Sequence, residues 1–75
     1  MSRTPEEPLG NRIEQVRTSV GMSRRELANR VGVHYQTIGY LERGEYNPSL
    51  VLAFRISQVL GEPLDALFYL PGENK

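Results

Sequence analysis

The sequence predicts an all-α domain made of five short helices. Apolar residues recur at helical spacing in five segments, and a glycine or a proline stands at the boundaries between them. The chain has only 75 residues, and a chain of that length can bury one modest core. We therefore expect one domain over residues 9–70. Residues 1–8 carry prolines and no apolar periodicity and are expected to form a flexible arm, and residues 71–75 a polar tail.

The first two helices have clear ends in the sequence. Gly21 is expected to end the first helix and Gly32 the second. Residues 23–26 read Ser-Arg-Arg-Glu, a capping box in which the serine hydroxyl accepts the glutamate amide and starts a helix over residues 24–31. The apolar positions that define the first helix are Ile13, Val16 and Val20.

Three further helices follow. Residues 34–43 carry inward apolar positions at helical spacing and end at Gly44. Residues 50–60 are apolar on nearly every face, which indicates burial on more than one side. Pro63 opens a last short helix over residues 64–68, because proline is pre-organised for the first helical turn.

Composition excludes several classes of site. The chain has no cysteine, so a disulfide or a thiolate metal site cannot form. His34 is the only histidine, and no acidic pair is spaced to complete a site with it, so we expect no metal, no cofactor and no enzyme activity. No apolar run is long enough to cross a membrane, and the first residues lack the apolar stretch of a signal peptide. We therefore expect a cytoplasmic protein without a membrane partner.

The second and third helices predict a helix-turn-helix. Two short helices, 24–31 and 34–43, are joined by a tight turn at Gly32, and Ala28 is small where they would cross. Formal charge is zero overall, but residues 23–44 hold four arginines and two glutamates, which leaves this segment at +2. Such an arrangement can place the second helix in the major groove of DNA.

Several pieces of the chain, in order, resemble the phage-repressor and Cro type of helix-turn-helix, also called the xenobiotic-response-element family. The resemblance spans about residues 11–68 and implies a five-helix domain that is dimeric on double-stranded DNA and has no catalytic site. The matching pieces are Ser23-Arg24-Arg25-Glu26-Leu27-Ala28, Val31-Gly32-Val33, Gln36-Thr37-Ile38, Leu41-Glu42-Arg43-Gly44 and Tyr46-Asn47-Pro48-Ser49-Leu50.

The resemblance also implies roles for individual residues. An equivalent of Glu42 is paired with an arginine of the first helix in the family, and Arg17 matches that position. Gln36 keeps the family's residue type, and glutamine can pair bidentately with adenine. Where many relatives have serine then arginine, this chain has His34 then Tyr35, and Arg24 replaces the usual glutamine. The implied base-reading residues are His34, Tyr35, Gln36, Gly39 and Tyr40, and the phosphate-binding residues are Arg24, Thr37 and Arg43.

His34 has a second interpretation, as a solvent-facing residue at the start of its helix. For the whole chain, the first hypothesis is a sequence-specific transcriptional regulator, a repressor that binds a palindromic operator as a homodimer. The alternative is a protein-interaction module, such as an antitoxin, that uses the same surface. A regulatory protein partner fits either hypothesis. The dimer interface is expected on surplus apolar residues of the last two helices and the tail, namely Val51, Leu52, Val59, Phe68, Tyr69 and Leu70.

Overall fold

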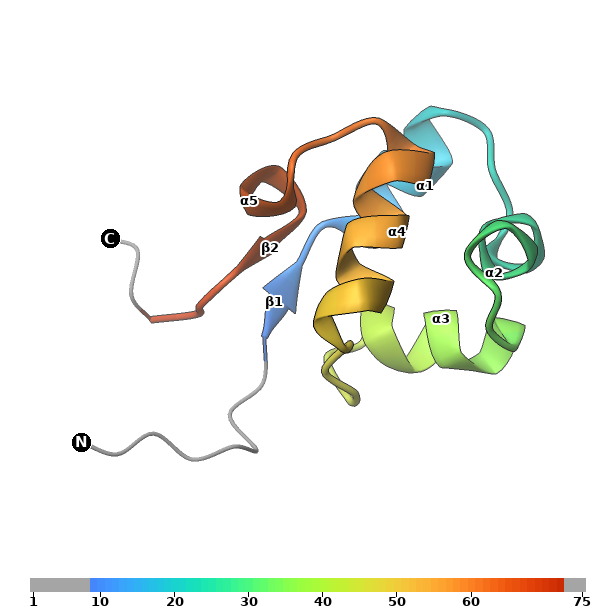
Figure 1. The fold of residues 1–75 in the computed structure, drawn as a ribbon. Helices are drawn as coiled ribbons and strands as arrows, with labels where there is room; N and C mark the ends of the chain where they lie inside the picture. Colours follow the sequence, from blue (N-terminus) through green and yellow to red (C-terminus); the bar gives the residue numbers. More distant parts are fainter. Residues whose placement is uncertain (1–8, 73–75) are drawn as a thin grey trace.

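The computed structural model describes residues 9–72, so the arm expected at 1–8 and the end of the tail lie outside the described residues. The five expected helices are present (Figure 1). The elements, in chain order, are β1 (Gly10–Asn11), α1 (Ile13–Ser19), α2 (Arg24–Val31), α3 (Tyr35–Glu42), α4 (Leu50–Leu60), α5 (Leu64–Leu67) and β2 (Phe68–Tyr69). Among the described residues, no helix is long and apolar enough to cross a membrane.

A small antiparallel pair of strands joins the two ends of the domain, which the sequence did not predict. Gly10 lies opposite Tyr69 and Asn11 opposite Phe68. The amide of Arg12 extends the pairing by donating to the carbonyl of Leu67 at 2.8 Å. The last helix was expected to extend to Phe68, but it ends at Leu67 because Phe68 and Tyr69 pair with β1 as a strand.

Local hydrogen bonds set the helix starts. The Ser23 hydroxyl accepts the Glu26 amide at 3.0 Å, which confirms the predicted cap of α2. Asn11 precedes α1, and its Oδ1 accepts the amide of Ile13, the first residue of the helix, at 3.0 Å. Its Nδ2 also donates to the Leu41 carbonyl at 2.8 Å and thereby ties this start to the end of α3. Gly32 ends α2 with φ +82°, a conformation that a side chain disfavours, and turns the chain toward α3.

One apolar core fills the space between the five helices. Two residues differ in burial from what the sequence predicts. Leu52, expected in a dimer interface, is 7% exposed and belongs to the core, while Val20, expected on the inner face of α1, is 55% exposed because the helix ends one residue earlier. The buried cluster consists of Ile13, Leu27, Ala28, Val31, Ile38, Leu41, Leu52, Ile56, Leu60 and Leu67.

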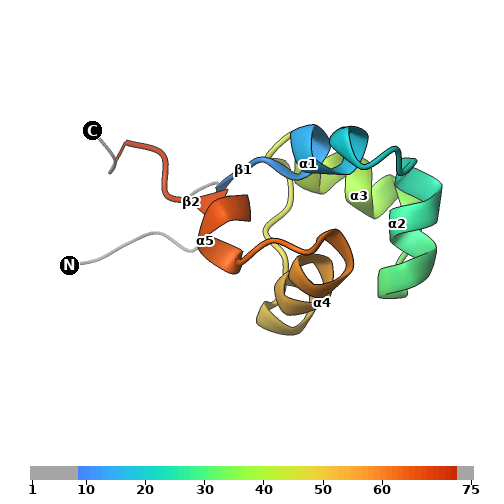
Figure 2. The same ribbon diagram turned by 90° about the horizontal axis from the view of Figure 1, so that it is seen from above.

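The elements divide between two ends of the molecule. In both views, α2 and α3 lie at one end and α5 with the strand pair lies at the other (Figures 1 and 2). Helix α4 packs against α2 and against α5, and so connects the two ends. The outer side of α3 is thus left without a covering element of the described chain, and this is where the expected base-reading residues lie.

Candidate nucleic-acid interface

The apolar side chains of helix α3 anchor it to the core. Ile38 and Leu41 are 0% and 2% exposed and point into the core, and Ala28 on α2 is equally buried. Their burial leaves the opposite side of α3 for polar and aromatic residues. Tyr35, Gln36 and Tyr40 are all exposed there.

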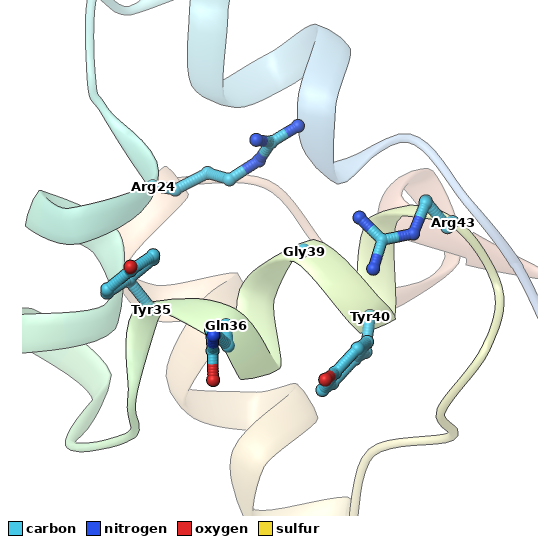
Figure 3. A pocket seen from close by; sticks show the side chains of 6 residues that line it. All are labelled: Arg24, Tyr35, Gln36, Gly39, Tyr40 and Arg43. Carbon is cyan, nitrogen blue, oxygen red and sulfur yellow. The ribbon is translucent and has the colours of Figure 1, made fainter.

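Six of the eight residues expected to contact DNA line a single shallow hollow on this face. The hollow has a volume of about 180 Å³, and Figure 3 shows its lining side chains. Arg24 reaches over it from α2, and Arg43 approaches from the end of α3. The structure thus brings together Arg24, Tyr35, Gln36, Gly39, Tyr40 and Arg43.

His34 and Thr37 lie outside the hollow. His34 caps α3, since its Nδ1 accepts the Gln36 amide at 3.1 Å, and it is exposed, as the helix-start interpretation requires. The Thr37 amide donates to the His34 carbonyl at 3.0 Å, so this amide is already used and only the partly buried hydroxyl is left for a phosphate. A base contact by His34 stays a prediction.

Gly39 makes room for Arg43 on the surface of α3. Gly39 is buried, and a Cβ at this position would lie 3.3 Å from Arg43 Nη1. The Arg43 guanidinium lies 5.4 Å from the centre of the Tyr40 ring and pairs with Glu45 at 3.3 Å. Both partners of this ion pair are about half exposed, so it is a weak competitor for a phosphate.

Glu42 holds two arginines from two other segments. Its Oε2 accepts Arg17 Nε at 2.7 Å, which confirms the expected pairing, and its Oε1 accepts Arg24 Nε at 2.8 Å. The Glu42 side chain is 1% exposed and the Arg17 side chain 8%. The hydrogen bond to Glu42 and the charge of that carboxylate raise the pKa of Arg24 above its usual value. Sequence reasoning missed this second partner of Glu42.

The residues expected in a dimer interface fall into three groups. Leu52 is in the core, and Val59 and Phe68 are partly buried against it. Tyr69 lies at the edge of β2, where the Arg12 guanidinium stacks 4.5 Å from its ring centre. Val51 and Leu70 are exposed, as expected.

Two exposed apolar residues of α4 were missed. Leu50 is 68% and Phe54 50% exposed, and both belong with Val51 on the outer side of the first turns of α4. The sequence pattern could have predicted this exposed apolar side. Residues 50–60 are apolar on nearly every face, and positions 50, 51 and 54 share one side of a helix. A groove of about 410 Å³ adjoins this side and is lined by Leu9, Pro48, Leu50, Ala53, Leu64, Asp65 and Phe68.

Comparison with known proteins agrees with this geometry. A family model described as helix-turn-helix matches residues 13–67, which include all five helices. The chain is also 45% identical over 66 residues to an uncharacterized HTH-type transcriptional regulator of Archaeoglobus fulgidus, covering 88% of this chain and 94% of that protein. The chain belongs to the helix-turn-helix family of DNA-binding transcriptional regulators.

The structure of this helix-turn-helix regulator is similar to solved structures of both small and much larger proteins. It is similar to the restriction-modification controller protein C.AhdI from Aeromonas hydrophila, with a TM-score of 0.68 and 30% identity over 72% of this chain and 82% of that one. It is also similar to hydroxypropylphosphonic acid epoxidase from S. wedmorenis, with a TM-score of 0.67 and 31% identity, but this match covers only 29% of the enzyme. The fold therefore also occurs as one part of an enzyme, whereas the relative from Archaeoglobus fulgidus is named as a transcriptional regulator.

Proposed function

We propose that this regulator binds a palindromic operator as a homodimer, inserts α3 into the major groove of each half-site, and represses transcription by occupying a promoter. The observation that carries this proposal is the hollow on the outer face of α3. It combines one amide side chain, two tyrosines and a glycine with an arginine on each side. Planar donors and acceptors suit base edges, and arginines suit the phosphates that border a groove.

Within this proposal, the residues divide between bases and phosphates. Gln36 pairs with an adenine through its amide, and Gly39, which has no side chain, lets the Arg43 guanidinium lie against the helix beside it. Tyr40 presents both a ring and a hydroxyl to the groove, Tyr35 lies at its border, and His34 contacts the edge of the site. Arg24, Arg43 and the Thr37 hydroxyl bind phosphates and fix the register of α3.

The homodimer follows from the small size of one recognition helix. A single α3 reads only a few base pairs, whereas two copies related by a two-fold axis engage half-sites roughly 34 Å apart. We place the interface on Val51, Leu50 and Phe54, together with the groove that Phe68 lines and with Leu70. These residues provide the exposed apolar surface that a stable contact between copies requires.

The exposed apolar groove also supports the alternative function, a module that binds another protein. Selection from a random pool of duplexes distinguishes the two functions. We expect an enriched palindrome whose binding weakens steeply as salt rises, because several phosphate contacts release counterions. A pool without enrichment, together with capture of a protein in a salt-insensitive complex, would instead establish the interaction module.

A further inference from the structure

We propose that Arg25 is a further phosphate-binding residue of this interface and that Tyr35 positions it. The proposal rests on the proposed function, because it concerns the same docked arrangement. Arg25 is exposed on the first turn of α2, and its guanidinium carbon lies 4.0 Å from the centre of the Tyr35 ring at the start of α3. The His34 ring stacks on the same tyrosine, 4.8 Å away between ring centres and inclined by 25°.

The charge of Arg25 is uncompensated, unlike that of the other arginines nearby. Arg24 is bound to Glu42, and Arg43 is paired with Glu45. Arg30 is paired with Glu26 at 3.3 Å, one turn apart on α2. Among residues 9–72, Arg25 has no acidic partner. Its positive charge is therefore available to an external anion.

The contact with Tyr35 leaves the donors of Arg25 available. An aromatic ring attracts a guanidinium through its face, whereas the N–H groups of the guanidinium point outward in its own plane. This contact orients Arg25, and among residues 9–72 none of its side-chain N–H groups donates a hydrogen bond to another residue. An ion pair has the opposite effect, as at Arg24, where Nε is already committed to Oε1 of Glu42.

The position of Arg25 fits a phosphate of the DNA backbone. The first helix of a helix-turn-helix crosses the backbone while the second lies in the groove, and Arg25 is on the first turn of that first helix. The start of a helix also favours an anion through its dipole. A hollow of about 230 Å³ beside the guanidinium is lined by Arg25, Asn29, Val33, His34 and Tyr35.

Tyr35 consequently has a different role from the one that the resemblance implies. It belongs to the α3 hollow and to the Arg25 hollow, and its ring holds the arginine at the border between them. Tyr35 is then a positioning residue for a phosphate contact, and its removal lowers affinity for every sequence alike. A residue that read a base would lower affinity only for the preferred sequence.

A salt titration on a short fluorescent duplex of mixed sequence tests the assignment. One lost phosphate contact makes the slope of log K against log salt shallower by about 0.9, which weakens binding about eightfold at about 0.1 M salt. We expect this change for Arg25→Ala. The matched control is Arg30→Ala, which removes the same charge from the same helix and is expected to keep most of the affinity, since Arg30 lies in the last turn of α2, away from the first turn that is proposed to face the backbone.

The positioning role is tested in the same assay. Tyr35→Ala is expected to weaken binding about two- to fivefold, the equivalent of an exposed cation–π contact, and Tyr35→Phe to restore it. In an Arg25→Ala background, Tyr35→Ala is expected to have no further effect, and circular dichroism melts check that each variant is folded. Equal effects of Arg25→Ala and Arg30→Ala overturn the phosphate assignment, and a full additional loss in the double variant overturns the positioning role.

The two proposals fail in different ways. A wild-type protein without salt-dependent binding to any duplex contradicts both the proposed function and this inference. If Gln36→Ala leaves the preference for a selected sequence unchanged while Arg25→Ala still weakens binding to mixed DNA, the base-reading role is wrong and the phosphate contact of Arg25 stands.

Discussion

Arg17 and Glu42 form a two-pronged ion pair that connects α1 to the last residue of α3. Arg17 Nε donates to Oε2 of Glu42 at 2.7 Å and Nη2 donates to Oε1 at 3.3 Å, while Nη1 donates to the Met22 carbonyl at 3.0 Å. Both side chains are almost fully excluded from water. The orientation of α3 against the rest of the domain therefore depends on a buried charge pair.

Removing one partner of this pair is expected to destabilise the domain strongly. Glu42→Ala leaves the Arg17 guanidinium buried beside no carboxylate, which costs about 3–5 kcal/mol of the free energy of unfolding. Urea unfolding followed by circular dichroism measures it. Glu26→Ala is the control, because it breaks the exposed pair with Arg30 and is expected to cost less than about 1 kcal/mol. A Glu42→Ala protein that unfolds at the wild-type urea concentration would contradict the structural role.

Gln36 is expected to determine the preference for one base in each half-site. Under the proposed function the Gln36 amide pairs with adenine, so Gln36→Ala is expected to cost about 1–3 kcal/mol on the preferred operator. Affinity for unrelated duplexes is expected to change little, because Gln36 is proposed to contact a base and not a phosphate. Binding curves on the selected operator and on variants of it, one base pair at a time, measure both effects. An equal loss on all duplexes would show that Gln36 reads no base.

Arg24 is expected to contribute to affinity without contributing to sequence preference. Under the proposed function Arg24 binds a phosphate, so Arg24→Ala is expected to make the slope of log K against log salt shallower by about one unit on every duplex. Stability is expected to change much less than for Glu42→Ala, because Glu42 keeps its buried partner Arg17. Salt titrations of binding and urea unfolding of the same variant test the two statements. A large loss of stability would show that Arg24 acts mainly through Glu42.

The exposed apolar side of α4 is expected to hold the two copies together. Phe54→Asp places a charge in this surface and is expected to shift the protein from dimer toward monomer in sedimentation velocity and to weaken operator binding. Val20→Asp is the control, since Val20 is a similarly exposed apolar residue that follows α1. If Phe54→Asp remains a dimer with full affinity for the operator, the interface lies elsewhere.

The close packing of Gly10 against the Tyr69 ring in the strand pair can be tested by substitution. A Cβ added at Gly10 would collide with the ring of Tyr69, so Gly10→Ala is expected to lower the free energy of unfolding by about 1–3 kcal/mol. In a Tyr69→Ala background the ring is gone, and the same substitution is expected to cost much less. A double-mutant cycle of the four proteins by urea unfolding measures this coupling. Additive effects would show that the cost of Gly10→Ala does not come from the Tyr69 ring.

Much of the fold was predictable because its information is local. The capping serine before α2 and the turn at Gly32 depend on neighbouring residues alone, and both were predicted correctly. The outer face of α3 was also predictable, since burying Ile38 and Leu41 leaves Gln36 and the tyrosines outside. The pairing of Arg17 with Glu42 came from family resemblance, because no periodicity relates a residue of one helix to a residue of another.

The sequence by itself therefore determined the helices, their order and the side of α3 that is free for DNA. Only the tertiary structure decided which distant groups meet. It paired two strands of two residues each, too short to show a pattern, and so ended the last helix before Phe68. The tertiary structure also pairs Glu42 with a second arginine, Arg24, and brings the Arg25 guanidinium over the Tyr35 ring. It also buried Leu52 and exposed Leu50, because a helix that is apolar all round shows its inner side only once its neighbours are packed against it.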